Sequence, residues 1–277
     1  MDKKTIDDKT VNEYLDRIGV PRPEVLDGAS LAVLHRAHLL AVPFENLSLH
    51  LAEPVSLEPD DLMDKIVTRR RGGFCYELNG AFALLLRALG AEVSLAAAAV
   101  YGGDRLGPPF DHLALIVRLA DGGRWLVDIG FGDHSVYPLD LDDRQEQADP
   151  AGRFQLIETG LIKTGEGDLD LLRDGKPRYR LELRERSMGD FGPTCWYQQT
   201  SPKSHFTQNT VCSRLTEDGR ITLSGRTLTR TVTTADNTEG GTRTEEELTT
   251  DDAVLAAYRD HFGVVLDRLP ILSPVGP

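Results

Sequence analysis

Cys75 is the residue whose type and position best suit covalent chemistry. It follows Gly72, Gly73 and Phe74, and it begins an apolar run that predicts a helix over residues 75–89. Backbone amides at a helix N-terminus favour a thiolate over a thiol, and the thiolate is the nucleophilic form of cysteine. A cysteine in this position can also be an inert packing residue. A catalytic role therefore requires a histidine and a carboxylate placed beside it.

A predicted hairpin supplies both partners. Residues 113–119 and 124–130 are rich in β-branched residues and flank Asp121-Gly122-Gly123, so we expect two antiparallel strands joined by a tight turn. His112 immediately precedes the first strand, and Asp128 lies near the end of the second. Both therefore belong to the same edge of the sheet. The register of a three-residue loop would place their side chains on one face, whereas a slip of one residue would separate them. The sequence leaves both registers open.

A thiol, an imidazole and a carboxylate together are typical of acyl transfer. The thiolate attacks an acyl carbon, the imidazole holds and returns the proton, and the carboxylate fixes the imidazole tautomer. Each residue also has a structural interpretation. His112 can be a solvated or core-edge histidine, and Asp128, between Val127 and Ile129, can be a buried carboxylate with a structural partner. The residues alone leave these interpretations open.

The elements that must position these residues change character along the chain. Apolar spacing and end signals predict helices over residues 11–18, 30–42 (with Ser30 as N-cap), 60–69 and 75–89. Strands are then predicted near 92–101, 113–119, 124–130, 154–158, 179–185, 195–199, 211–215, 221–223 and 227–233. A polar loop at 236–247 and a helix over 251–262, with Thr250 as N-cap, complete the chain. The order is a helical segment, a mostly antiparallel β segment and a mixed α/β segment.

Composition narrows the functional classes. The net charge of −13 argues against nonspecific binding of nucleic acid or of an anionic membrane, both of which need a basic surface. A polar start at Asp2-Lys3-Lys4 and the lack of an apolar run of 18 residues predict neither a signal peptide nor a membrane span. The three cysteines are widely spaced, with no CxxC pair or Cys/His cluster. We therefore expect a reduced cytoplasmic protein with no disulfide framework and no metal site.

Five segments of the chain, in order, resemble those of the arylamine N-acetyltransferase family, in its bacterial form. They are Val42-Pro43-Phe44-Glu45-Asn46-Leu47, Arg71-Gly72-Gly73-Phe74-Cys75, the region of His112, Val127-Asp128-Ile129-Gly130-Phe131-Gly132, and Thr200-Ser201-Pro202-Lys203-Ser204-His205-Phe206. The resemblance covers most of the chain and is weakest at the extreme N-terminus, at 140–190 and in the C-terminal tail. Five segments in the family order are much more specific than any one of them.

The resemblance implies an α+β multidomain fold with a cysteine-protease-like Cys-His-Asp core. Residues 1–90 would form a helical bundle that carries Cys75, residues 91–200 an antiparallel β-barrel-like domain that carries His112 and Asp128, and residues 201–277 an α/β lid. It also implies ping-pong chemistry. Cys75 would take an acetyl group from acetyl-coenzyme A as a thioester, and an arylamine or hydrazine would then attack that thioester.

The resemblance further assigns binding and structural roles. Phe44, Phe131 and Phe206 match aromatic positions that line the acceptor pocket, although each can also be core. The cofactor would enter between the second and third domains, beside residues 200–207 and especially Ser204, His205 and Thr207. Glu45, Arg71 and Asn79 resemble a structural network that packs the cysteine loop against the second helix. As oxyanion donors we expect the Cys75 amide and an amide from the residues after Tyr101.

Three other functions remain open at this stage. Amide synthases that close macrolactams resemble these transferases and take their acyl group from a carrier protein. A thiol hydrolase or transglutaminase-like enzyme would use the same order of Cys, His and Asp but pass the acyl group to water or to a lysine. A non-catalytic binding module would keep the fold without the reaction.

Overall fold

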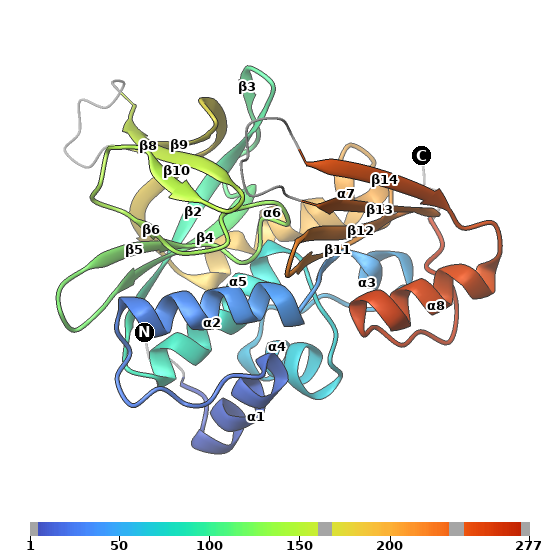
Figure 1. Cartoon of the computed structure of the whole chain (residues 1–277), viewed down its shortest axis with the longest axis horizontal. Helices are drawn as coiled ribbons and strands as arrows, with labels where there is room; N and C mark the ends of the chain where they lie inside the picture. The colour runs from blue at the N-terminus through green and yellow to red at the C-terminus, as the bar shows by residue number, and fades with distance from the viewer. Residues whose placement is uncertain (1–4, 160–167, 233–240, 273–277) are drawn as a thin grey trace.

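The computed structural model describes residues 5–159, 168–232 and 241–272. Helices from the N-terminal third pack beneath two antiparallel sheets, one strongly curved and one closer to flat (Figure 1). The expected α+β class, with a helical segment, a barrel-like sheet and a C-terminal lid, is confirmed. The predicted domain boundaries at residues 90 and 200 remain a prediction.

The N-terminal helices begin and end at the expected kinds of residue. Asp7 caps the first helix by accepting a hydrogen bond from Thr10 N, and Gly19 ends it in the left-handed conformation with φ 71°. The predicted start of the second helix at Ser30 is wrong. Asp27 is the N-cap, and Ser30 is the third helical residue of a capping box with it. The helices are α1 (Asp8–Ile18), α2 (Gly28–Ala41), α3 (Leu47–His50), α4 (Pro59–Met63), the π-helical turn η1 (Asp64–Thr68) and α5 (Cys75–Ala88).

Helix α5 is the centre of the fold. Its residues from Cys75 to Leu86 are all buried. The helix packs against α1, α4, α6 (Met188–Thr200), β2 (Glu92–Gly102) and β4 (His112–Arg118). Gly90 follows it with φ 99° and ends the helix as predicted. Since the helix is surrounded on every side, the residue at its N-terminus is held by both the helical layer and the large sheet.

The large sheet curls into a nearly closed barrel. Its strand order is β6-β5-β4-β2-β10-β9-β8-β7, with β3 paired to β2. The Gln147 side chain joins the two end strands, β7 and β6, by two hydrogen bonds to the Asp140 backbone. Gln147 Oε1 accepts from Asp140 N, and Gln147 Nε2 donates to Asp140 O. The strands are β2 (Glu92–Gly102), β3 (Arg105–Leu106), β4 (His112–Arg118), β5 (Arg124–Val127), β6 (Leu139–Asp140), β7 (Gln147–Asp149), β8 (Gly152–Glu158), β9 (Leu169–Arg173) and β10 (Lys176–Arg186).

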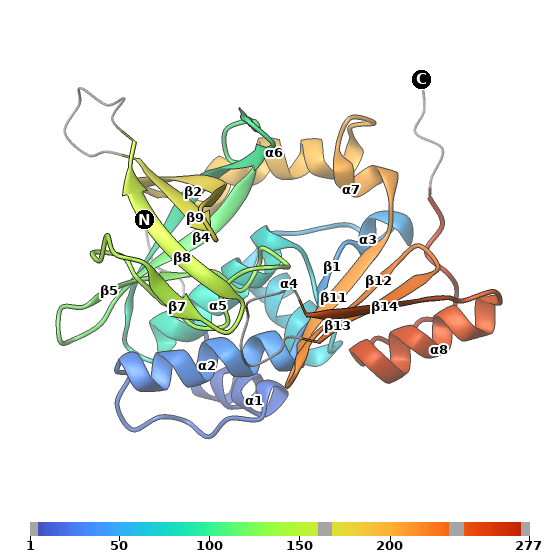
Figure 2. The same cartoon turned by 45° about the horizontal axis from the view of Figure 1, so that its top comes forward.

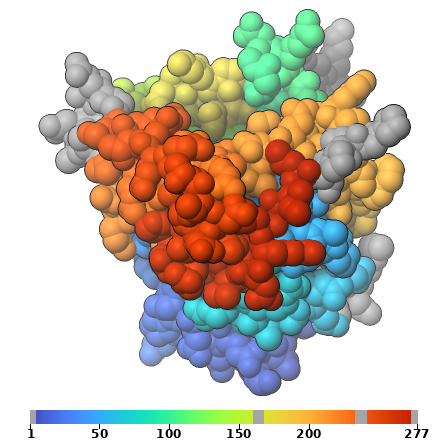
Figure 3. All heavy atoms as spheres, turned by 90° about the vertical axis from the view of Figure 1, so that its right-hand side faces the viewer, coloured from blue at the N-terminus to red at the C-terminus, as the bar shows by residue number. Residues whose placement is uncertain are grey.

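The second sheet forms the lid. Its order is β1-β11-β12-β13-β14, with strands β1 (Phe44–Glu45), β11 (Val211–Thr216), β12 (Gly219–Ser224), β13 (Thr227–Val232) and β14 (Thr242–Glu247). Helix α8 (Asp251–Phe262) shares a buried cluster with this sheet and with Leu47 and Leu51 of the N-terminal segment. Figure 3 shows the orange and red C-terminal elements lying above the blue and cyan N-terminal helices. Strand β1 therefore ties the helical segment to the lid.

Two sequence predictions in the C-terminal half are wrong. Residues 195–199 lie in helix α6 (Met188–Thr200) rather than in a strand, because Ser187 and Asp190 form an N-terminal capping box that the Gly192-Pro193 breaker obscured. Helix α6 and the short α7 (His205–Gln208) run from the large sheet toward the lid (Figure 2). Part of the predicted loop 236–247 is strand β14, an exposed edge whose charged residues disguise it; residues 236–240 lie outside the described part.

Among the described residues, no helix is long and apolar enough to cross a membrane.

Candidate active site

Cys75 occupies the first position of α5, and the glycine pair before it is required by close packing. A Cβ on Gly72 would lie 2.0 Å from the carbonyl oxygen of Pro43, and one on Gly73 would lie 2.7 Å from Glu77 Oε2. Glu45 N also donates to Gly73 O at 2.9 Å. The glycines therefore let the chain pass tightly along β1 and deliver Cys75 to the helix N-terminus, where amide groups without intrahelical partners are found.

The hairpin register that the sequence left open places His112 and Asp128 together. Leu115 lies opposite Val127, and Leu119 pairs with Gly123 across a three-residue loop. This register puts residue 114 opposite residue 128, so His112, two residues earlier, shares a face with Asp128. His112 is the first residue of β4 rather than the residue before it. Its Nε2 lies 2.7 Å from Asp128 Oδ2, which leaves Nδ1 for proton exchange.

The electrostatics of this pair favour an imidazolium beside a carboxylate. Burial acts to lower the pKa of His112, but the negative charges of Asp128 and Cys75 together raise it to about 10. Burial alone would raise the pKa of Asp128; the positive charge of His112 and the hydrogen bonds to the carboxylate hold it well below its usual range. At neutral pH the arrangement therefore carries a cation next to the Cys75 sulfur, which is the setting that stabilises a thiolate.

Asn79 belongs to this pair and not to the predicted network with Glu45 and Arg71. Its Nδ2 donates to Asp128 Oδ1 at 2.9 Å and to the Leu113 carbonyl at 2.6 Å, and its Oδ1 accepts from Ile129 N at 3.0 Å. The side chain is fully buried. Asn79 therefore joins both strands of the hairpin to α5 and orients the carboxylate.

Two further contacts bring the hairpin and α5 together. Tyr76, next to Cys75, donates its hydroxyl hydrogen to the carbonyls of Phe110 and Asp111, just before His112, at 2.8 and 3.1 Å. Gly130 follows Asp128 closely, and a Cβ there would lie 2.8 Å from the Cys75 Cα. The absence of a side chain at residue 130 is what allows the second strand's end to reach the cysteine.

Buried ion pairs hold the cysteine loop. Arg71 Nε donates to Glu45 Oε1 at 2.9 Å, and Arg71 Nη1 donates to Glu53 Oε2 at 3.0 Å. Lys65 pairs with Glu77 at 2.6 Å, and Glu77 also accepts from Phe74 N. Glu45 and Arg71 thus have the predicted structural role. They fix the cysteine loop to β1 and to the segment around Glu53, whereas the prediction placed it against the second helix.

Cys75 and His112 line a cavity of about 700 Å³ between the large sheet and the lid. The three predicted aromatic residues line it as well. Phe131 stands edge-on to the His112 ring with centroids 5.1 Å apart, and the Phe44 and Phe206 rings are 6.1 Å apart. The wall near the reacting groups is therefore aromatic and apolar, as a flat aromatic ligand requires.

The segment predicted to meet the cofactor is tied to the N-terminal part by Asn46. Its Nδ2 donates to the carbonyls of Phe206 and Asn209 at 2.9 and 2.7 Å. Ser204 and His205 line the cavity, but Thr207 is not among the lining residues. The Thr207 hydroxyl donates to backbone carbonyls within its own turn. The hydroxyl of Ser204 is buried against the Gln198 carbonyl oxygens.

Two residues beside Asp128 were not predicted. The Tyr179 hydroxyl lies 3.2 Å from His134 Nε2, and that nitrogen lies 3.8 Å from Asp128 Oδ2. Burial lowers the pKa of His134 to about 4 and raises that of Tyr179 well above its usual value, so both are neutral at pH 7. The only sequence signal was proximity, since His134 follows Asp128 by six positions; Tyr179 comes from the distant strand β10.

Known proteins are similar to this chain over most of its length. A family model described as N-acetyltransferase matches residues 27–271. Arylamine N-acetyltransferase 1 of Homo sapiens is 34% identical over 262 residues, which cover 86% of this chain and 90% of that protein. The chain belongs to the arylamine N-acetyltransferase family. The resemblance stated from the five sequence segments is thereby confirmed.

Solved structures of family members share the fold over nearly the whole chain. The M. smegmatis arylamine N-acetyltransferase matches with a TM-score of 0.83 at 30% identity, covering 97% of this chain and 100% of that one. The Mycobacterium marinum enzyme, solved in complex with CoA, matches with a TM-score of 0.79 at 29% identity, covering 92% of each chain. The family likeness therefore includes the helical segment, the barrel-like sheet and the lid.

Proposed function

We propose that this protein transfers an acetyl group from acetyl-coenzyme A to the nitrogen of an arylamine or arylhydrazine, through a thioester on Cys75. The observation that carries the proposal is the buried His112–Asp128 pair at 2.7 Å, facing Cys75 in an aromatic cavity of a chain that belongs to this family. The relative solved with CoA supports the choice of donor.

Each step follows from the positions of the three residues. The Cys75 thiolate attacks the acetyl carbonyl carbon, the bond from that carbon to the coenzyme A sulfur breaks, and coenzyme A leaves as a thiol with a proton from His112. The amine nitrogen then attacks the Cys75 thioester and loses its proton to His112, and the carbon–sulfur bond to Cys75 breaks as the amide forms. Asp128 keeps the His112 ring oriented and stabilises its cation. A thioester exchanges with a thiolate at little energetic cost and remains reactive toward amines.

The mouth of the cavity has groups that suit a phosphorylated cosubstrate. Arg105, Lys203 and His205 line it and are exposed. The positive charges of Arg105 and Lys203 are available to phosphate groups in an otherwise acidic protein. We assign His205 and the neighbouring Ser204 backbone to coenzyme A. Thr207 would act by shaping the turn, since its hydroxyl is used there. Phe44, Phe131 and Phe206 are assigned to the acceptor.

The expected cellular setting belongs to the same proposal. Cys75, Cys195 and Cys212 are free thiols, which suits a reducing compartment, and we propose the cytoplasm. The amide-synthase alternative shares the site but needs a carrier-protein donor; it is not favoured, because the relatives that match over most of this chain are arylamine N-acetyltransferases.

The test is the intact mass of the protein after mixing with acetyl-coenzyme A in the absence of an acceptor. We expect one added acetyl group on Cys75, discharged by 4-aminosalicylate or hydralazine. Cys75→Ser and His112→Ala should abolish the added mass while far-ultraviolet circular dichroism stays unchanged, and Cys195→Ser, which replaces another buried cysteine, should retain it. An unmodified wild-type protein would contradict the proposal and direct the next test to an acyl-carrier donor.

A further inference from the structure

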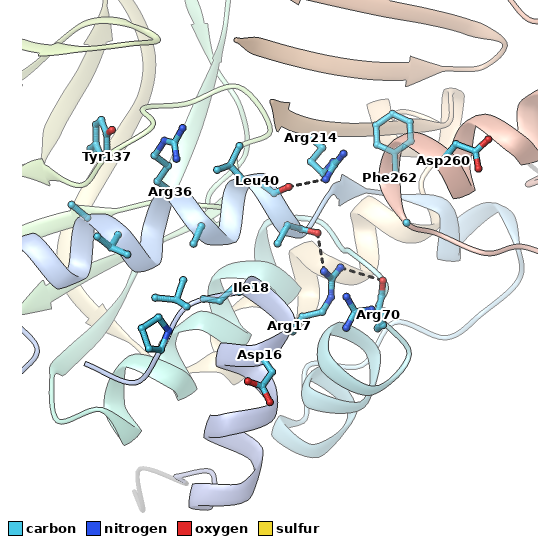
Figure 4. A pocket seen from close by; sticks show the side chains of 18 of the residues that line it. Asp16, Arg17, Ile18, Arg36, Leu40, Arg70, Tyr137, Arg214, Asp260 and Phe262 are labelled. Atoms are coloured by element: carbon cyan, nitrogen blue, oxygen red, sulfur yellow. Dashed lines mark hydrogen bonds between the residues drawn. The ribbon is translucent and has the colours of Figure 1, made fainter. Parts of the chain in front are cut away.

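A second large cavity, of about 1020 Å³, lies away from Cys75, where the N-terminal helices meet the lid. It is bounded by the C-terminal half of α1, by α2, by β11 and by the C-terminal end of α8 (Figure 4). None of its lining residues lines the Cys75 cavity. Nothing in the acetyl-transfer chemistry requires it.

The charge of this cavity is opposite to that of the protein. The chain carries a net charge of −13, yet arginines outnumber acidic residues in the lining, which contains Arg17, Arg36, Arg70, Arg214 and Arg259 against Asp16 and Asp260. Arg36 pairs with Glu217, and Arg259 pairs with Asp260. Within the described ranges, the other three arginines have no carboxylate partner. The cavity therefore has an excess of unneutralised positive charge.

Arg17 and Arg214 are fixed in place by carbonyl groups at the end of α2. Arg17 Nη1 donates to Ala41 O at 2.9 Å, and Arg214 Nη1 donates to Leu40 O at 2.8 Å. Figure 4 shows the two guanidinium groups approaching this helix end from opposite sides, Arg17 from α1 and Arg214 from the lid. The partial negative charge of a helix C-terminus favours cations there, but it does not neutralise two whole charges.

Arg17 is the most buried of these arginines, with only 7% of its surface exposed, so its charge most needs a partner. Its Nη2 donates to Arg70 O at 3.3 Å, and Arg70 adopts an unusual φ of 53°. The Nε atoms of Arg17 and Arg214 are buried and have no hydrogen-bond acceptor in the described part of the chain. Burial, together with the charges of Arg70 and Arg214, lowers the pKa of Arg17 to about 10. An anion in the cavity would relieve this repulsion.

The uncharged part of the lining is mostly apolar. Ile18, Val20, Pro21, Ala37, Leu40 and Phe262 line it. Arginine guanidinium groups are planar forks that bind carboxylates and phosphates through paired hydrogen bonds. A cavity that combines such groups with apolar side chains fits a small molecule with an anionic head and an apolar body.

We propose that this cavity is a second ligand site, which binds small organic anions consisting of a carboxylate or phosphate head on an apolar body. Arg70 and Arg214 contact the head, and Arg17 supplies positive charge from behind. Because the lining comes from α1 and α2 on one side and from β11 and α8 on the other, a bound anion links the helical segment to the lid. Binding therefore stabilises the folded protein.

The experiment is calorimetric titration of the full-length protein, done both without coenzyme A and with saturating coenzyme A, which occupies the Cys75 cavity. The probes are benzoate, phenyl phosphate and the neutral benzamide, and each is also tested for its effect on the melting temperature. The variants are Arg70→Gln and Arg214→Gln. Arg22→Gln is the matched control, because Arg22 is an exposed arginine of the same region, paired with Asp8, and does not line the cavity.

We expect one anion per chain, and each cavity substitution should weaken binding roughly tenfold or more, as the loss of a charge-assisted hydrogen bond does. Arg22→Gln should bind as the wild type does. Binding of benzoate alone identifies a carboxylate site, and binding of phenyl phosphate alone a phosphate site. Benzamide should not bind, and added salt should weaken the binding of both anions, because it screens their attraction to the arginines.

Four results would overturn the proposal: no saturable binding of either anion, equal binding of benzamide, full affinity in both cavity variants, or binding that coenzyme A abolishes. The last result would place the anion in the Cys75 cavity. A purely structural role of the arginines predicts a lower melting temperature in the variants with no anion bound by any form. None of these readouts uses acetylation of Cys75, so failure here is distinct from failure of the proposed function.

Discussion

Replacing Asn79 by alanine should weaken both the fold and the reaction, because one side chain makes three buried contacts. The change would leave Asp128 Oδ1, the Leu113 carbonyl and the Ile129 amide each without the bond that Asn79 provides. Asp128 Oδ1 still accepts from Gly130 N at 3.1 Å. Counting only the Leu113 carbonyl and the Ile129 amide, at about 1–3 kcal/mol for each buried group that loses a partner, the loss is about 2–6 kcal/mol in the free energy of unfolding. That is a large part of the roughly 5–15 kcal/mol that stabilises a typical domain.

Two assays separate the effects of this substitution. Urea denaturation should give the loss in unfolding free energy, and the melting temperature should fall on the order of 10 °C. At a temperature where the variant is still folded, the rate of Cys75 acetylation should fall roughly tenfold to a hundredfold, because Asp128 is no longer held against His112. Asn12→Ala, at an exposed position of α1, should change stability by less than about 0.5 kcal/mol.

A pH profile tests whether Asn79 acts by positioning. The pKa of His112 is raised to about 10, largely by Asp128. In the wild type the rate of Cys75 alkylation should therefore change only near that pH, where His112 loses its proton and no longer stabilises the thiolate. If Asn79 orients the Asp128 carboxylate, this alkaline limb of the curve of alkylation rate against pH should move to lower pH in Asn79→Ala. The reasoning is refuted if unfolding free energy stays within about 1 kcal/mol of the wild type or if the limb does not move.

Three further predictions follow from the same contacts. Gly130→Ala should lower the rate of Cys75 acetylation and cost about 1–3 kcal/mol of stability by overpacking, since its Cβ would lie 2.8 Å from the Cys75 Cα; equal acetylation and melting in wild type and variant would contradict this. Arg71→Met should cost about 3–5 kcal/mol in urea denaturation by leaving the Glu45 carboxylate buried alone, and the added change Glu45→Gln should restore part of the loss, whereas no recovery would count against the pair. Because His112 has a folded pKa of about 10, above its unfolded value of 6.5, its contribution to stability should be complete below pH 6.5 and disappear as pH rises through 10; Asp128→Asn should flatten that dependence in denaturation curves, and an unchanged slope would argue against it.

Local sequence signals were reliable where structure depends on neighbouring residues. Helix α8 begins at Asp251 with Thr250 as its cap, as predicted, because a hydroxyl acceptor and an apolar period act within a few residues. The hairpin that carries His112 and Asp128 followed from its β-branched runs and its turn. The same reasoning failed for α6 and β14, where a capping box beside Gly192-Pro193 and a wholly exposed charged edge strand conceal the element.

The sequence by itself determined the candidate reactive set: one cysteine at a helix start, a histidine at the start of a strand and an aspartate near the end of its partner. It also determined the family, through five ordered segments. Only the tertiary structure decided the hairpin register, the transfer of Asn79 from the Glu45–Arg71 network to Asp128, and the contact of Tyr179 with His134. The reason is physical: caps and periodicity are set by residues close in sequence, and a one-residue change of register leaves that local pattern almost unaltered. The Asn79–Asp128 and Tyr179–His134 contacts join residues 45 or more positions apart, and they exist only after the sheet and α5 have packed together.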